Sequence, residues 1–112
     1  MVMMDGLSPA LSPVDRQLRF AIAHKRLVEV KYDGRLRVAE PHDYGLKNGH
    51  PKVLVYQLHV TGSVKGAGQR GWRLFDVSKI ALCAVSAATF AGSRSDTSQQ
   101  HFTWDEIFAR VG

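Results

Sequence analysis

The chain has 112 residues, 45% of them hydrophobic and 22% charged, which suits one compact domain and leaves too little chain for two. The 15 Lys and Arg residues outnumber the 10 Asp and Glu residues, and the net charge of +5 permits a polyanionic partner without requiring one. No apolar run approaches the roughly 18 residues of a membrane-spanning helix, and the first residues lack the pattern of a signal peptide. We therefore expect a cytoplasmic protein with no membrane partner.

The first predicted element is a helix that follows a flexible arm, residues 1–12. Ser12 is suited to cap the helix and Pro13 to its first position, and the acidic Asp15 complements the helix dipole in the first turn. Apolar residues then recur at spacings of three and four, which places one apolar stripe on the helix: Val14, Leu18, Ala21 and Ile22.

The pattern changes to period two after this helix. Alternation over residues 27–32 predicts a strand, and Asp33-Gly34 predicts a tight hairpin turn into a second strand that runs from Arg35 toward Tyr44. Pro41 lies inside the second strand and cannot donate a backbone hydrogen bond, so we expect a bend, a bulge or an edge there. Asn48-Gly49 marks the next turn.

The later segments predict three more strands and a short helix. Residues 52–61 have apolar side chains on both faces, as in a central strand, and a glycine-rich loop over residues 62–71 leads to strands at 72–77 and 80–87. Residues 92–102 have the composition of a linker. Thr103 and Glu106 form a possible capping box, so residues 103–112 are expected to be a short helix. Its apolar stripe would comprise Trp104, Ile107, Phe108 and Val111.

This order favours a mainly β (α+β) fold: a helix, a small five-stranded antiparallel sheet that is strongly bent or partly closed into a barrel, and a C-terminal helix. The barrel domain with its helix would cover residues 13–91. Spacing of the βαβ kind is missing from the sequence, which argues against a doubly wound fold.

Several motifs match one small module. Ala21-Ile22 precedes a strand, Val28–Tyr32, of the type apolar-x-apolar-x-Tyr; Arg37 stands four residues before Pro41; and residues 73–80 place Arg73, Phe75 and Ile80 in register with a third motif. Over residues 17–90 the chain thus resembles the WYL domain, an Sm-like or SH3-like β-barrel. It departs from that pattern where Lys52-Val53-Leu54 aligns with Trp-Tyr-Leu, where Asp76 replaces an arginine and where Lys79 replaces another.

The resemblance implies a regulatory, non-enzymatic domain that senses a ligand, with single-stranded nucleic acid or nucleotides as the expected class. Domains of this family usually follow a winged-helix DNA-binding module, for which this chain is too short. The resemblance therefore implies a free-standing sensor-like domain, or one that has lost its sensing surface. Arg37 and Arg73 are the residues that match the family at the expected ligand site.

Basic and aromatic residues at the strand ends suggest where an anion could bind. Arginine suits phosphate because its planar group donates two hydrogen bonds at once, and aromatic rings can stack on bases. The candidate ligand residues are Arg35, Arg37, Lys52, Arg70, Trp72, Arg73, Lys79, His42 and Tyr44, with Tyr56 and His59 nearby. The alternative is a solvated basic surface around a core that contains these rings.

Other chemistry has little support in the sequence. The histidines lack metal-ligand spacing, the glycine-rich loop does not open a helix as a phosphate loop does, and no serine is paired with a base, so we expect no metal, no cofactor and no catalysis. The single cysteine, Cys83, excludes an intramolecular disulfide and reads as a small buried strand residue in preference to a reactive thiol. A rival to ligand binding is self-association, for example a homodimer, or docking of a protein partner through the barrel edge and the C-terminal helix.

Overall fold

The computed structural model describes residues 12–62, 69–94 and 103–112. The predicted arm (residues 1–12), the interior of the glycine-rich loop (63–68) and most of the predicted linker (95–102) lie outside these described residues, apart from Ser12. What the structure describes is mainly β, with one α-helix and a six-stranded antiparallel sheet.

The helix α1 spans Pro13–His24 and begins where its capping residues predict. The Ser12 hydroxyl accepts a hydrogen bond from the Asp15 backbone N–H at 3.0 Å, which satisfies one of the unpaired amides of the first turn. The helix ends at Lys25, whose φ of 54° is left-handed and whose N–H bonds back to the last turn. Leu18, Ala21 and Ile22 on its apolar stripe are buried against the sheet.

Two tight turns set the register of the first three strands, β1 (Arg26–Tyr32), β2 (Arg35–Lys47) and β3 (His50–Val60). Asp33-Gly34 and Asn48-Gly49 both have positive φ at the two central positions, which confirms the predicted hairpin turns. The ladder between β2 and β3 shifts register at Pro41, as expected of a residue that cannot donate.

The sheet follows the strand order β4-β3-β2-β1-β5, where β4 is Gly71–Asp76 and β5 is Leu82–Thr89. Within the described part of the chain β4 and β5 stand at opposite ends of this path and are not paired, so the sheet is bent but not closed and the predicted barrel is wrong. A barrel closes only when its end strands come into hydrogen-bonding register. Here the short 3-10 turn η3 (Val77–Lys79) carries the chain from one end of the path to the other without such a pair.

The predicted C-terminal helix is also wrong, because residues Glu106–Arg110 form a sixth strand, β6. This strand pairs with Asp43–Leu46, the half of β2 beyond Pro41, whereas β1 pairs with the half before it. A helix of eight to ten residues is marginal by itself, and an open half-strand offers backbone hydrogen bonds that only an extended segment can take. Arg110 adds two bonds to the buried carboxylate of Asp43, at 2.9 and 3.2 Å.

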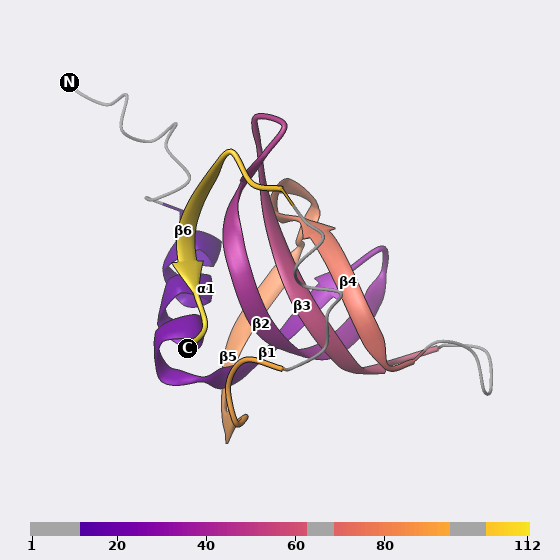
Figure 1. Ribbon diagram of the computed structural model, residues 1–112. Coiled ribbons are helices and arrows are strands. Elements are labelled where there is room, and N and C mark those ends of the chain that lie inside the picture. The colour runs from indigo at the N-terminus through magenta and orange to yellow at the C-terminus, as the bar shows by residue number, and fades with distance from the viewer. Residues whose placement is uncertain (1–11, 63–68, 95–102) are drawn as a thin grey trace.

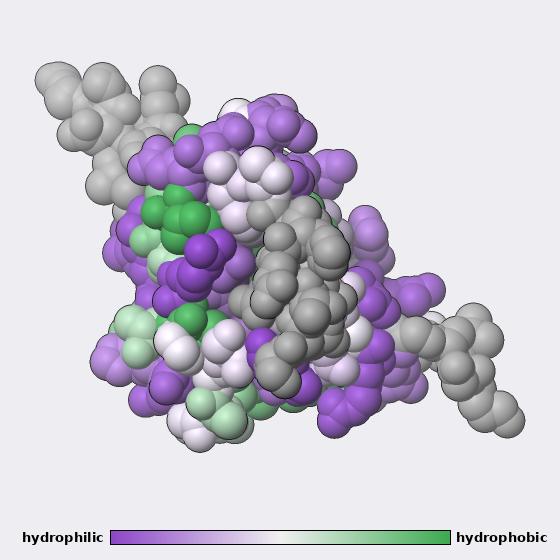
Figure 2. All heavy atoms as spheres, in the orientation of Figure 1, coloured by the Kyte–Doolittle hydropathy of each residue, from purple (hydrophilic) through white to green (hydrophobic). Residues whose placement is uncertain are grey.

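Figure 1 shows α1 and β6 side by side on the left of the view, with β4 on the right. The buried core lies between the helix and the concave face of the sheet, and Val111 at the end of β6 belongs to it. The face of the molecule drawn in Figure 2 is mainly hydrophilic, apart from a small hydrophobic patch over β6. Among the described residues no helix has the length and apolar content that crossing a membrane requires.

Candidate anion-binding site

Arg37 is held in position by neutral acceptors. Its Nε donates to the backbone oxygen of Tyr32 at 3.2 Å and its Nη1 to Oε1 of Gln57 at 2.9 Å. Gln57 is itself buried and donates to the backbone oxygen of Gln69 at 2.8 Å. The guanidinium also lies 5.5 Å from the ring centre of Phe75, which stacks on Tyr32. These contacts orient the half-buried cation without neutralising its charge.

No ion pair in residues 12–62, 69–94 and 103–112 includes Arg37. Burial lowers the pKa of its guanidinium; the exposed carboxylate of Asp33 acts in the opposite direction, and the positive charges of Arg35 and Arg73 lower the pKa further. A half-buried cation with two cationic neighbours is a position where an anion gains electrostatic energy by binding.

Arg73 reaches the same region from β4. Its strand position pairs with Val55, and the next pair along the same face joins Gln57 to Gly71. The Arg73 Nη1 donates to the Trp72 oxygen at 2.9 Å, and a Cβ added to Gly71 would lie 3.1 Å from that same nitrogen. The absence of a side chain at Gly71 therefore leaves room for the arginine beside Gln57.

Arg35 completes the group, since it lies two residues before Arg37 on β2 and therefore on the same face of the strand. Its side chain is exposed. We call Arg35, Arg37 and Arg73 the arginine site. The sequence predicted all three residues, and the structure brings them to one side of the sheet.

The other predicted basic residues are placed differently. Lys52 lies 3.6 Å from the carboxylate of Asp76, so its charge is already partnered. Arg70 and Lys79 are exposed, the first just before β4 and the second in η3. None of the three is among the charges that perturb Arg37.

The predicted stacking platforms are mostly core residues. Tyr44 is 0% exposed and its hydroxyl donates to Asp15 at 2.6 Å, so its ring has no free face. His42 is likewise 0% exposed, in edge-to-face contact with Trp72 at 4.8 Å between ring centres. Trp72 is also in edge-to-face contact with Tyr56, with 5.3 Å between the ring centres. In this conformation neither Tyr44 nor His42 can stack on a base, because both rings are covered by the fold.

A buried polar cluster around His42 was missed by the sequence reading. Its Nδ1 bonds to the Glu40 backbone oxygen at 2.9 Å, while its Nε2 has no hydrogen-bond partner among the described residues and lies 4.0 Å from the Glu40 carboxylate. That carboxylate is held by Arg94 through bonds of 2.8 and 3.0 Å, and the Arg94 guanidinium stacks 3.6 Å from the ring centre of Tyr56. Burial lowers the pKa of His42.

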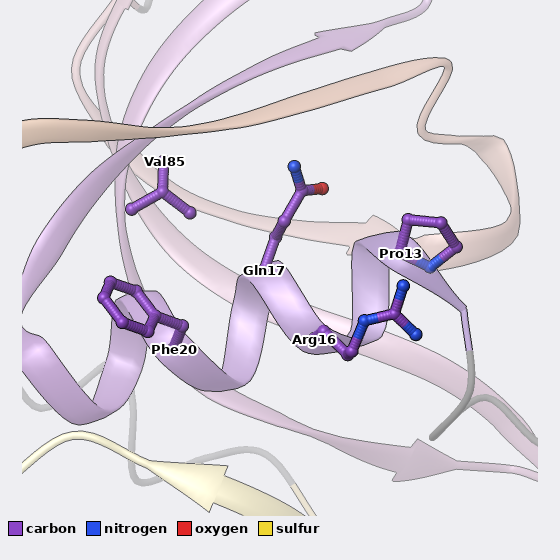
Figure 3. A pocket seen from close by; sticks show the side chains of 5 residues that line it. All are labelled: Pro13, Arg16, Gln17, Phe20 and Val85. Carbon is purple, nitrogen blue, oxygen red and sulfur yellow. The ribbon is translucent and has the colours of Figure 1, made fainter.

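A separate open pocket of about 360 Å³ lies between α1 and β5. The helix supplies Pro13, Arg16, Gln17 and Phe20, and Val85 projects from the strand, as Figure 3 shows. No residue of the arginine site lines it. The described residues contain no group of three or more His, Cys, Asp or Glu side chains placed to hold a metal ion.

Comparisons with models of protein families, with curated proteins and with solved structures found no match to this chain.

Proposed function

We propose that this protein is a non-enzymatic, WYL-like regulatory domain that binds a nucleotide or single-stranded nucleic acid through the arginine site. The observation that carries the proposal is the un-neutralised, half-buried charge of Arg37, held by Tyr32 and Gln57 and flanked by two more arginines. An anion brought to this position would interact favourably with the positive charge of Arg37. Arginine donors fixed in advance also lose little entropy when phosphate binds.

The test is binding of a fluorescein-labelled single-stranded oligonucleotide to the full chain, followed by fluorescence anisotropy over a range of salt concentrations. We expect the logarithm of the association constant to fall linearly with the logarithm of salt, by about 0.7 per phosphate contact for a single strand. An Arg37→Gln/Arg73→Gln double variant should bind at least tenfold more weakly. The matched control removes two charges elsewhere, Arg16→Gln on α1 and Lys31→Gln on the outer face of β1.

Two results would refute the proposal: no binding at low salt, or equal losses in the double variant and its control. Arg37→Gln removes the donor to Gln57 and can weaken the fold. Oligonucleotide binding by Arg35→Gln is therefore measured as well, because Arg35 is exposed and its replacement should leave the free energy of unfolding unchanged.

A second candidate function is self-association through the open end of the sheet. Leu36 and Leu82 are 51% and 61% exposed, and both pair with Lys31, which places them in one row across β2, β1 and β5. An exposed apolar row beside an edge strand is a common dimer surface. Light scattering of the wild type and of Leu82→Lys, with the exposed Ala87→Lys as control, tests it: a monomeric wild type would rule this function out.

A further inference from the structure

A row of side chains crosses the adjacent strands β2, β3 and β4 (Figure 1). Glu40 pairs with Tyr56, and Tyr56 pairs with Trp72, so these three side chains lie next to one another on one face of the sheet. Trp72 and Arg73 are consecutive on β4, so the row and the arginine site lie on opposite faces of that strand. We call Glu40, Tyr56 and Trp72, together with His42, the Glu40 row.

This row already holds one guanidinium group, that of Arg94. The Arg94 Nε and Nη2 donate to the two carboxylate oxygens of Glu40 at 2.8 and 3.0 Å. The same group lies 3.6 Å from the ring centre of Tyr56, and Trp72 contacts that ring edge-to-face at 5.3 Å between ring centres. A two-bond contact with a carboxylate and stacking on an aromatic face both suit a planar guanidinium better than an ammonium group.

His42 adds a further acceptor to the Glu40 row. Its Nδ1 donates to the backbone oxygen of Glu40, because a carbonyl oxygen can only accept, so the neutral ring presents a lone pair at Nε2. That nitrogen is buried, lies 4.0 Å from the Glu40 carboxylate and bonds to no atom among the described residues. The carboxylate, this nitrogen and the Tyr56 ring all favour a ligand with a positive charge and several N–H donors.

The position of Arg94 in the chain allows another guanidinium group to replace it. Arg94 follows β5 and belongs to no helix or strand, so its departure from the row breaks no strand pair. The Arg94 side chain is 35% exposed and that of Glu40 only 10%, so the cation is reached from solvent and the carboxylate lies beneath it. A carboxylate buried in this way is costly without a cation beside it, so release of Arg94 favours a substitute cation.

We propose that the Glu40 row is a binding site for a guanidinium group, that Arg94 occupies it as an internal ligand, and that an arginine side chain of another protein can take its place. This inference goes beyond the proposed function and uses none of the residues of the arginine site.

The experiment empties the site and offers it a replacement. Wild type and Arg94→Ala are titrated with N-acetyl-arginine methylamide, which mimics an arginine within a peptide, and binding is followed by the indole N–H signals in two-dimensional NMR spectra. We expect Arg94→Ala to bind at least about fivefold more tightly, because the tethered Arg94 of the wild type competes at an effective concentration in roughly the millimolar range.

Three further ligands test the chemistry of recognition. The citrulline derivative has the same shape without the charge and should not bind. The lysine derivative keeps the charge without the planar group and should bind at least about threefold more weakly than the arginine derivative. Tighter binding of free L-arginine than of the methylamide would overturn the assignment to an arginine carried by a protein.

Arg110→Ala is the matched control. Arg110 donates two bonds to the buried carboxylate of Asp43, as Arg94 does to Glu40, but stacks on no ring in the described part of the chain. Its removal should therefore create no comparable site. The double variant Arg94→Ala/Glu40→Gln should lose the gain in binding. Arg94→Lys, which keeps the charge, should also bind more tightly than the wild type and serves as the test if Arg94→Ala does not fold.

Equal binding by the wild type and Arg94→Ala would overturn the inference, and so would equal gains in Arg94→Ala and Arg110→Ala. Equal affinities for the arginine and citrulline derivatives would also contradict it. Oligonucleotide binding by Arg94→Ala should equal that of the wild type, so a failure of this inference leaves the proposed function in place.

Discussion

The buried hydrogen bond between Asp15 of α1 and Tyr44 of β2 leads to a quantitative prediction about stability. Asp15 is 0% exposed and its carboxylate accepts the Tyr44 hydroxyl at 2.6 Å and the Arg19 Nε at 3.1 and 3.0 Å. Replacing Asp15 by Ala leaves the buried hydroxyl without an acceptor, at about 1–3 kcal/mol, and removes a favourable charge from the helix N-terminus, at about 0.3–1 kcal/mol. We expect Asp15→Ala to cost about 3 kcal/mol in total.

Tyr44→Phe removes one hydrogen bond to a charged acceptor, which is worth about 1.5–3 kcal/mol. The double variant lacks both groups, so no buried hydroxyl is left unpaired. Its loss should be smaller than the sum of the single losses by about 1–2 kcal/mol, the range expected for side chains in direct contact.

The assay is urea unfolding followed by the fluorescence of Trp72 and Trp104, with all four proteins of the cycle measured together. Arg19→Gln is the control, because the Arg19 side chain is 39% exposed and can exchange its partner for water. Single losses that simply add up in the double variant would contradict the reasoning, as would an Arg19→Gln loss as large as that of Asp15→Ala.

Three further predictions follow from other buried groups. Burial lowers the pKa of His42, so as the pH falls the imidazole is protonated in the unfolded chain before it is protonated in the folded one. The free energy of unfolding should therefore decrease below about pH 6.5, by at most about 1.4 kcal/mol per pH unit. Urea unfolding of His42→Gln should show a weaker dependence on pH than the wild type, and the same dependence in both proteins would contradict this prediction. Burial raises the pKa of Cys83 to about 11, so a disulfide reagent at pH 8 should modify it far more slowly than free cysteine until urea is added. A Cβ at Gly45 would collide with the Glu106 carbonyl oxygen, so Gly45→Ala should speed amide exchange in β6, whereas Gly112→Ala, in open space, should not.

Much of the fold could be predicted because local chemistry determines it. Positive φ at Asp33-Gly34 and at Asn48-Gly49 demands residues that tolerate it, and the Ser12 cap is local by nature. The strand β6 could not be predicted, since its apolar residues fit a short helix as well as a strand. The unpaired half of β2 decides between them, and that partner is more than sixty residues away in sequence.

The charged residues of the arginine site could be predicted from the sequence, but the contacts that hold them could not. The resemblance identified Arg37 and Arg73, yet the orientation of Arg37 depends on Gln57, a polar residue on the apolar face of β3. Gln57 itself was the available clue in the sequence, because a polar side chain among apolar ones on a strand face is expected to need a hydrogen-bond partner. The burial of Tyr44 depends on Asp15 from a distant helix, which periodicity within one strand cannot reveal.

The division of β2 between two partners also bears on how the protein is made. During synthesis, the half of β2 beyond Pro41 is complete some sixty residues before β6 can cover its edge. A ribosome adds about 5–20 residues per second, so this edge stays uncovered for several seconds in each new molecule. Chains that stop before Glu106 would keep it open and be prone to pair with one another, which makes truncated copies natural targets for chaperones and proteases.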